Sequence, residues 1–372
     1  MSVADRPLVR TPVADLRRAV CCALACVVAT PACADPPRPV HPTAPAPLEP
    51  APVARIVAPE PEPTPPPTEP SPEPPPLDPE VARADGRVTV TIHAPVEELL
   101  VTPYGLVWTH DGAVWAALDE RAGAELLARQ ADPHGLAGDD NALYWAGAER
   151  HVRHTLATGE QTEIPGLDPR FMQVQGFAVG PPLAALVDRP IALWRVRWPG
   201  PRLELVRLRA DPEWQRASDL RAGGGSLFFS VLTKPAGGSP ETSIVAVDAR
   251  GRARARPTGQ RRLSQGAWDV DARGVVVLVA DGQLHRLGPQ DASPRPVLAL
   301  PDATMLCWCG PRVCSVDAKA REIQARDLRS GAVTTLASEA DPVVRLACGS
   351  KQVAWATDTR IVAVPTRTRP GP

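Results

Sequence analysis

Residues 133–147 read Pro-His-Gly-Leu-Ala-Gly-Asp-Asp-Asn-Ala-Leu-Tyr-Trp-Ala-Gly, which is a short apolar segment, a polar turn and a second apolar segment. The second segment recurs in weaker form about every forty residues toward the C-terminus. Its copies are residues 106–108, 143–145, 184–186, 227–229, 275–277, 313–315 and 353–355. A repeat of this length that is built from short strands is typical of a β-propeller or a similar array.

The copies have the composition of strands joined by tight turns. They are rich in aliphatic or aromatic residues and lie near Gly, Asp-Gly or Pro. Asp111-Gly112 and Asp281-Gly282 each follow one such strand and precede another, as in a β-hairpin. Third strands are predicted at residues 113–115, 191–194, 244–247 and 361–364, and fourth strands at, for example, 125–128 and 332–336. Four antiparallel strands per repeat predict the blade of a propeller.

The globular part of the chain is predicted to run from residue 87 to residue 366. Divided by the repeat length, it predicts an all-β, seven-bladed propeller, with six blades as the alternative. The last repeat lacks a fourth strand, whereas residues 87–92 form an isolated strand with alternating apolar residues. Because either edge would be exposed alone, we expect residues 87–92 to pair with residues 361–364 and close the ring.

Residues 1–34 have the pattern of an export signal. Arg17-Arg18 precede the apolar residues 19–29, a stretch too short to span a membrane. The small residues Ala32-Cys33-Ala34 predict cleavage after Ala34, and lipid attachment at Cys33 is the alternative. We therefore expect an exported protein of the periplasm or cell surface. An outer-membrane lipoprotein is the alternative, in which the lipid anchor would be the only membrane contact.

Residues 35–80 are nearly half proline, with glutamate and threonine among the rest. Such a segment cannot bury a core and samples extended polyproline II conformations, which predicts a disordered linker. Its proline runs also suit a docking ligand, although a spacer between an export signal and a folded domain explains the composition more simply. A disordered tail is predicted at residues 367–372.

The cysteines outside the signal are Cys307, Cys309, Cys314 and Cys348, all in the last two repeats. In an oxidising compartment an even number of cysteines predicts disulfides. With residues 311 and 312 as the turn of a hairpin, Cys309 and Cys314 would lie directly opposite each other, and Cys307 with Cys348 would form a second bridge. A metal site and buried free thiols are the alternatives, and the spacing lacks the paired Cys-x-x-Cys motifs of zinc modules.

Length, charge and motifs narrow the function without identifying it. The chain has 372 residues and a formal net charge of -1, which gives no basis for nucleic-acid binding. Phosphate-binding loops, zinc-protease motifs and nucleophile elbows are missing from the sequence. We therefore expect no cofactor, no metal and no catalytic residue, and a monomer.

Three local patterns have a simple explanation and a sharper alternative. Four Asp-Pro pairs precede inner strands, at Asp132, Asp168, Asp211 and Asp341. Turn chemistry explains them, and a ring of carboxylates at the mouth of the channel is the alternative. His151 and His154 lie three residues apart on a strand and should face opposite sides, which argues against a metal pair. Asp269 and Asp271 share a strand face, and bonding within the following turn explains both.

The best candidates for a ligand surface lie on loops. Loops before inner strands and after second strands emerge on one face of a propeller, and they place Trp214, Arg216, Arg261 and Arg262 there. Aromatic residues and arginine are common in recognition sites. For Trp214 we favour the alternative that it packs between two blades.

The segments Leu143-Tyr144-Trp145-Ala146, Val107-Trp108-Thr109 and Ala354-Trp355-Ala356-Thr357-Asp358 resemble the repeat of exported bacterial β-propellers of the YWTD-like and TolB/NHL-like kind. The resemblance covers the globular part only, and most blades lack the full Tyr-Trp-Thr-Asp string. It implies a propeller with a non-catalytic binding or scaffolding role, with a protein or glycan of the cell envelope as partner. A propeller hydrolase or lyase is the alternative, which a histidine with two carboxylates at the channel mouth would favour.

Overall fold

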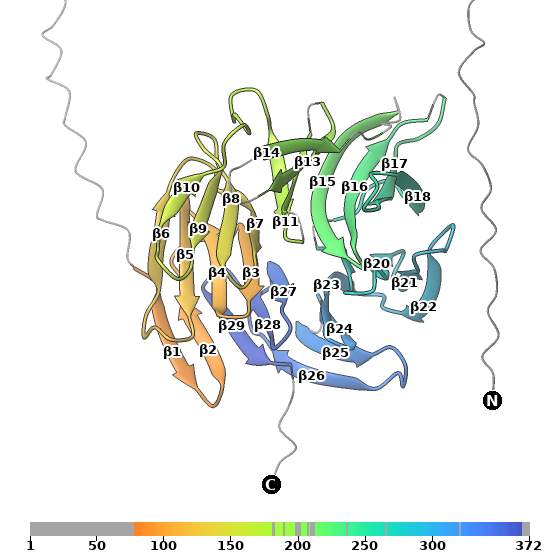
Figure 1. Ribbon diagram of the computed structural model, residues 1–372. Coiled ribbons are helices and arrows are strands. Elements are labelled where there is room, and N and C mark those ends of the chain that lie inside the picture. Colours follow the sequence, from red (N-terminus) through yellow and green to blue (C-terminus); the bar gives the residue numbers. More distant parts are fainter. Residues whose placement is uncertain are drawn as a thin grey trace, which may run out of the picture. The chain divides into compact units, whose positions relative to one another are not determined.

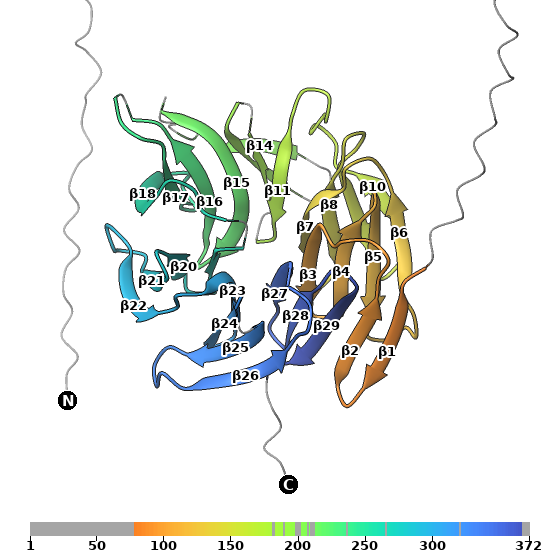
Figure 2. The ribbon, with the colours of Figure 1, turned by 180° about the vertical axis from the view of Figure 1, so that it is seen from behind.

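The computed structural model describes residues 78–366 except 181–182, 189, 198–201, 207, 209–212, 236, 265 and 320. Within these residues the regular elements are all β-strands, and they form seven sheets arranged as the blades of a propeller (Figures 1 and 2). The prediction of a seven-bladed all-β propeller is therefore confirmed, and the six-bladed alternative is wrong. None of the described segments is a helix that could cross a membrane.

Several predictions concern residues outside the described ranges. These are the export signal at residues 1–34, with Cys33 and Ala34, nearly all of the linker at 35–80, Asp211-Pro212 and the tail at 367–372. They stay predictions.

Blades 1 to 3 follow one another along the chain, and each has four strands in sequence order from the axis outward. Blade 1 consists of β3 (Glu98–Thr102), β4 (Gly105–His110), β5 (Ala113–Leu118) and β6 (Glu125–Arg129). Blade 2 consists of β7 (His134–Gly138), β8 (Ala142–Ala146), β9 (Val152–Thr155) and β10 (Gln161–Glu163). Blade 3 consists of β11 (Val174–Ala178), β12 (Leu183–Val187), β13 (Ala192–Arg197) and β14 (Arg202–Val206).

Blades 4 to 6 repeat the same order. Blade 4 consists of β15 (Trp214–Gly223), β16 (Ser226–Thr233), β17 (Glu241–Val247) and β18 (Ala253–Gln260). Blade 5 consists of β19 (Trp268–Val270), β20 (Val276–Ala280), β21 (Gln283–Leu287) and β22 (Arg295–Ala299). Blade 6 consists of β23 (Ala303–Cys309), β24 (Arg312–Asp317), β25 (Glu322–Asp327) and β26 (Val333–Ser338).

Blade 7 is built from both ends of the folded chain. Its strands, from the axis outward, are β27 (Arg345–Cys348), β28 (Gln352–Ala356), β29 (Arg360–Pro365), β2 (Arg87–Thr91) and β1 (Glu80–Ala84). β2 pairs antiparallel with β29, with Val90 opposite Ile361 and Val88 opposite Ala363. The predicted closure of the ring is therefore confirmed.

The outermost strand of blade 7, β1, was not predicted. It pairs with β2 through a hairpin at Asp85-Gly86, whose residues have φ of 51° and 75°. Positive φ at both positions is what a two-residue hairpin turn requires, and Asp111-Gly112 and Asp281-Gly282 show it too, as expected. The sequence EVARA of β1 is mostly exposed and lacks an apolar stripe, so its periodicity did not reveal it. The first strand of the described structure thus begins at Glu80, before the predicted start at residue 87.

An apolar cluster of buried residues fills each seam between neighbouring blades in the described structure. Trp108, Trp145 and Trp355 occupy the second strands of blades 1, 2 and 7, and each is fully buried in the seam with the preceding blade. Replacing such a side chain by alanine typically costs about 3–5 kcal/mol. The repeated Trp that defined the sequence motif is therefore a seam residue.

The inner strands contact one another around a closed ring, in the order β3, β7, β11, β15, β19, β23, β27 and back to β3. We call the end of the propeller at which these strands begin the start face, and the other end the hairpin face. Blade 4 differs from its neighbours because β15 has 10 residues, whereas β3, β7 and β11 have 5 each. Its strands extend beyond the ring at the start face (Figure 1).

Candidate functional site

The inner strands of the seven blades enclose a cavity of about 340 Å³ on the propeller axis. Most of its lining residues are glycine or apolar. The polar and sulfur-containing side chains among the described lining residues are Glu98, Gln175, Asp219, Arg221, Asp269, Arg345, Cys307 and Cys348, together with the thioether of Met305. None of the described lining residues is a histidine.

Glu98 joins blade 1 to blade 2. Its carboxylate accepts hydrogen bonds from the backbone N–H groups of Gly135 (2.9 Å) and Leu136 (2.8 Å) on β7. Gly135 has φ of 66°, and a Cβ there would lie 2.6 Å from the Cα of Gly176 on β11. Only glycine fits at this point, which gives a physical reason for the His-Gly that opens the sequence motif.

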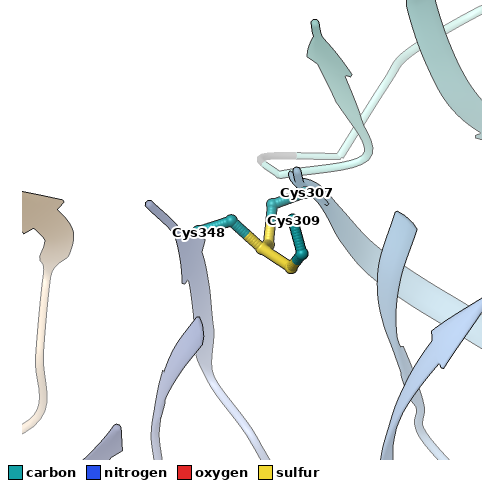
Figure 3. Close-up of side chains that lie close together, drawn as sticks. All are labelled: Cys307, Cys309 and Cys348. Atoms are coloured by element: carbon teal, nitrogen blue, oxygen red, sulfur yellow. A yellow bond between two sulfur atoms is a disulfide. The ribbon is translucent and has the colours of Figure 1, made fainter. Parts of the chain in front are cut away.

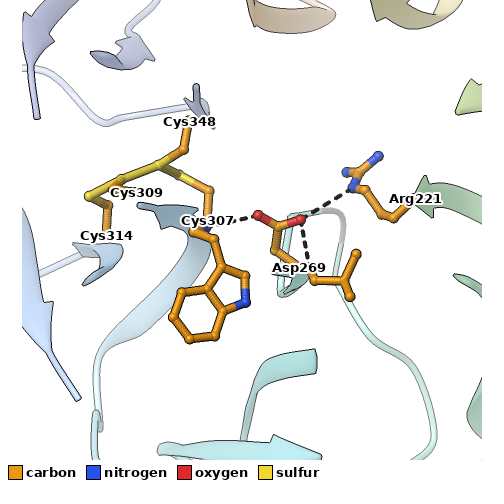
Figure 4. The surroundings of a disulfide bond; sticks show 8 residues. Arg221, Asp269, Cys307, Cys309, Cys314 and Cys348 are labelled. Carbon is orange, nitrogen blue, oxygen red and sulfur yellow. Dashed lines mark hydrogen bonds and ion pairs between the residues drawn. A yellow bond between two sulfur atoms is a disulfide. The ribbon is translucent and has the colours of Figure 1, made fainter. Parts of the chain in front are cut away.

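Asp269 joins blades 5 and 6 (Figure 4). Its carboxylate accepts hydrogen bonds from the N–H of Trp308 on β23 (2.8 Å) and from its neighbour Val270 (2.9 Å), and it lies 3.8 Å from Nε of Arg221 on β15. Burial raises the pKa of Asp269, against the lowering effects of Arg221 and the two N–H donors. About 20 % of its side chain still faces the cavity.

The prediction that turn bonding explains both aspartates is correct for Asp271 and wrong for Asp269. Asp271 accepts hydrogen bonds from the N–H groups of Arg273 (2.9 Å) and Val275 (2.8 Å) within its own turn. Asp269 instead bonds across two seams, because its side chain points toward the axis. Local sequence could not show this, since both main partners come from other blades.

Other seams have similar polar contacts between their inner strands. Nε2 of His134 on β7 is 2.7 Å from the carbonyl oxygen of Val174 on β11. Nε of Arg345 on β27 donates to the carbonyl of Glu97 (2.6 Å), which joins blades 7 and 1. We call these contacts, with those of Glu98 and Asp269, the polar clasps. Through these contacts, much of the cavity's polar lining bonds to neighbouring blades and so stabilises the ring.

The two histidines of the His151-x-x-His154 pattern point to opposite faces of blade 2, as predicted. The His151 ring packs edge-on against Phe177 of blade 3, whereas the His154 ring lies beside Trp145. Burial lowers the pKa of His151 to about 4, with a smaller contribution from His134, and also lowers the pKa of His154. They do not form a metal pair.

Of the three Asp-Pro pairs within the described residues, those at Asp132 and Asp168 take part in turns. Asp168 accepts a hydrogen bond from the N–H of Arg170 (2.9 Å), and its own carbonyl accepts from Phe171 and Met172. Asp132 has φ of 52°, a turn conformation. Neither residue lines the cavity, so these two carboxylates do not contribute to a ring at its mouth.

The four ligand-surface candidates all belong to the extended end of blade 4. Trp214 begins β15 and packs edge-on against Phe229 at 6.0 Å, within the apolar cluster between blades 3 and 4. Arg216 is exposed on the same strand, and Arg261 and Arg262 are exposed just after β18. Because β15 and β18 are three strand spacings apart, the two groups are separated by about 14 Å. The structure brings the candidates to one end of one blade without joining them in one pocket.

The four cysteines lie together where blades 6 and 7 meet (Figures 3 and 4). The hairpin between β23 and β24 turns at Gly310-Pro311, so Cys309 pairs with Arg312 and Cys307 with Cys314. The predicted turn at residues 311 and 312 is therefore wrong by one residue, because Gly310 adopts a φ of 63° that suits the first turn position. Cys309 and Cys314 remain within disulfide reach diagonally, with Cα atoms 6.1 Å apart.

The sequence did not indicate Glu98, Arg221 or Arg345 as lining residues. Each lies on an inner strand, and its side chain is set toward the axis by the strand's register. A signal was present, because charged residues on strands predicted to be innermost must be paired or face the cavity.

Comparisons with known proteins agree with this architecture. No family model matches the chain, and no curated protein matches its sequence. Among solved structures, a structure of YCF48 bound to D1 peptide has a TM-score of 0.57 at 10% identity, covering 79% of this chain and 99% of that one. RRP9 WD40 repeats give 0.54 at 11% identity, covering 78% and 98%. A virginiamycin B lyase from Staphylococcus aureus gives 0.51 at 11% identity, covering 77% and 94%. These similarities show the propeller fold alone, and they include both a peptide complex and an enzyme.

Proposed function

We propose that this chain is an exported, tethered binding module, whose propeller holds a protein partner in the cell envelope through the extended end of blade 4. The observation that carries the proposal is the contrast between the cavity and this end of the blade. Glu98 and Asp269 in the cavity are bonded to neighbouring strands, whereas the arginines of blade 4 are exposed. Export and tethering are supported by the patterns of residues 1–34 and 35–80.

The extended end of blade 4 suits an acidic partner segment. It presents Arg216, Arg261 and Arg262 together with exposed Lys234. Among the nearby acids, Glu241 accepts a hydrogen bond from the N–H of Gly259 (2.8 Å). Trp214 anchors the start of β15 against Phe229, so Arg216 lies on a strand that is packed against its neighbour. A preorganised surface loses less conformational entropy on binding than a flexible loop does.

The contrast between the bonded carboxylates of the cavity and the exposed arginines of blade 4 also supports a binding function over the alternative of a hydrolase or lyase. A hydrolytic site of the expected kind would place a histidine beside two carboxylates that are available to a substrate. The described lining residues offer carboxylates that already accept hydrogen bonds from protein N–H or hydroxyl groups. A glycan partner is the alternative occupant, and its recognition would depend less on positive charge.

The test is crosslinking of the full-length chain in cells, followed by co-purification. We expect one partner to be captured, and Arg216→Ala/Arg262→Ala to reduce its recovery at least tenfold. The matched control is Arg250→Ala/Arg254→Ala, which removes the same charge from exposed sites at the other end of blade 4. Equal recovery with both double variants would contradict the proposal, and loss of the partner when a soluble glycan rather than salt is added before crosslinking would identify a glycan site.

A further inference from the structure

Four cysteine sulfurs gather at the hairpin-face side of the seam between blades 6 and 7. Cys307 and Cys309 lie two residues apart on β23 and so share one face, and Cys348 ends β27. The Sγ atoms of these three residues all lie within 4.8 Å of one another. Cys314, on β24, approaches Cys309 from the other side (Figure 4).

The cluster allows more than one disulfide arrangement, and one of them is the predicted combination of Cys307–Cys348 with Cys309–Cys314. Three pairings are within reach, with Cα separations of 5.7 Å for Cys307–Cys348, 6.1 Å for Cys309–Cys314 and 5.4 Å for Cys309–Cys348. A disulfide sulfur bonds only one other sulfur, so the third pairing excludes the other two. Cys307–Cys348 and Cys309–Cys314 can form together, whereas Cys309–Cys348 excludes both, so the sulfurs share one small volume.

That volume has the size of one coordination sphere. Four thiolates around Zn²⁺, with Zn–S distances of about 2.3 Å, lie about 3.8 Å from one another in a tetrahedron. The Sγ atoms of Cys307, Cys309 and Cys348 are thus already close enough together to share an ion. The donors are all sulfur, which selects soft ions such as Zn²⁺ or Cu⁺ over Mg²⁺ or Ca²⁺.

We propose that, in its thiol form, this four-cysteine cluster binds one thiophilic d¹⁰ ion, Zn²⁺ or Cu⁺. Cys307, Cys309 and Cys348 supply three ligands, which suffices for Cu⁺, and Cys314 supplies the fourth for tetrahedral Zn²⁺. The site goes beyond the binding surface on blade 4 and does not depend on it. The ion would connect β23 to β27, and it would thereby do for this seam what the polar clasps do for others.

The surroundings of the cluster suit such a site. Cys307, Cys309 and Cys314 are buried, which shields a bound ion from competing water ligands. Cys307 and Cys348 also line the central cavity, which gives an ion a path from solvent to the sulfurs. Zn²⁺ or Cu⁺ binding would release protons from the thiols, so we expect binding to strengthen as pH rises.

The test uses the full chain with Cys21, Cys22, Cys26 and Cys33 replaced by serine, reduced and kept free of oxygen. Co²⁺ serves as the optical probe for Zn²⁺, and Cu⁺ is offered from a coloured chelator. We expect one equivalent of Co²⁺ to bind with sulfur-to-cobalt charge-transfer absorption and tetrahedral d–d bands. Zn²⁺ should displace it, and one equivalent of Cu⁺ should leave the chelator.

Two variants identify the ligands. Cys309→Ser should weaken Co²⁺ and Cu⁺ binding at least about 100-fold, more than a typical loss of an outer-shell partner. Cys314→Ser should weaken Co²⁺ binding and leave Cu⁺ binding nearly unchanged. If a variant fails to fold, protection of the four thiols from alkylation by the ion in the parent protein gives the same information.

Two results would overturn the proposal. One is a folded, reduced parent protein, with its native melting transition, that binds neither ion saturably. The other is binding that Cys309→Ser and Cys348→Ser leave unchanged. In either case the cysteines would form disulfides or remain free thiols, and they would not hold an ion.

Discussion

Blade 7 and blade 4 use their strands in opposite ways. Blade 7 has five strands drawn from both ends of the folded chain, and its seams are filled by buried residues such as Val90 and Trp355. Blade 4 is continuous in sequence, has the 10-residue strand β15 and leaves arginines exposed at its extended end. The first arrangement closes a ring, and the second presents a surface.

This difference predicts whether a substitution should change the free energy of unfolding or the binding of a partner. Changes in blade 7 remove buried contacts that several blades share, so they should alter the free energy of unfolding. Changes at the extended end of blade 4 remove groups that contact mainly water, so they should alter binding and little else.

The largest effect should come from removing the strands that complete blade 7. A chain lacking residues 1–77 keeps β1 and β2, whereas one lacking residues 1–92 loses them together with buried Val88, Val90 and Ile92. At about 1.5–3 kcal/mol for each of these three side chains, the loss amounts to about 4.5–9 kcal/mol. Urea unfolding should give a normal transition for the first chain and an unfolded or molten second chain. Equal urea midpoints for the two chains would show that the closing strands contribute nothing to the free energy of unfolding.

The next largest effect should follow Glu339→Ala. Only 1 % of the Glu339 side chain is exposed, and its carboxylate accepts hydrogen bonds from Nε1 of Trp355 (2.6 Å) and from Arg360, both in blade 7. Removing it leaves two donors without their acceptor, and we expect a loss of about 3–5 kcal/mol. Glu339→Gln keeps an acceptor for Trp355 and should cost less. A smaller loss for alanine than for glutamine, measured by chemical denaturation, would refute this role.

Acid should weaken the seams because they contain buried histidines, whereas the described residues at the extended end of blade 4 include no histidine. His151, in a seam, has a folded-state pKa of about 4, below its ordinary value of 6.5. Between these values the unfolded chain binds the proton and the folded chain does not, so stability falls as pH falls. The loss from His151 should reach about 3 kcal/mol near pH 4.

The check for His151 is the urea midpoint at pH 7 and pH 4.5 for the parent and for His151→Leu. The variant should lose less stability on acidification than the parent. His110 and His154, whose pKa values burial also lowers, should account for part of what remains. An identical pH dependence in both proteins would show that folding does not lower the pKa of His151.

The smallest effect on stability should come from Arg216→Ala/Arg262→Ala at the extended end of blade 4. Both side chains are exposed, so we expect a change within about 0.5 kcal/mol. Differential scanning calorimetry of this variant beside Arg250→Ala/Arg254→Ala gives the comparison. A loss of several kcal/mol would mean that this end of blade 4 supports the fold and is not a free surface.

The parts of the fold that the sequence predicted are those that local pattern and counting determine. Second strands were visible because their seam-filling residues, such as Trp145, repeat at a regular interval, and the closure followed from a count of unpaired strands. β1 was missed because residues 80–84 are mostly exposed and follow a proline-rich stretch, although Asp85-Gly86 carried a hairpin signal.

The candidate site was less predictable because it depends on contacts between blades. Asp269 looked like a turn residue, yet its hydrogen-bond donor Trp308 lies 39 positions away. The cysteine register changed because one glycine, Gly310, moved the turn by one residue. Arg261 and Arg262 lie on a loop as predicted, because loop position on a propeller is a property of the repeat itself. Trp214 and Arg216, also expected on a loop, instead lie on β15, which is longer than the inner strands of the other blades.

The pairing in blade 7 also determines how the propeller would respond to mechanical force. β1 runs parallel to β29, because both are antiparallel to β2, so Glu80 and Pro365 lie at opposite ends of the same blade. A pull on these two ends is directed along the strands, and the hydrogen bonds of β1, β2 and β29 would share the load in shear instead of opening one at a time. A propeller joined at both ends to other structures would therefore resist stretching through its closing blade.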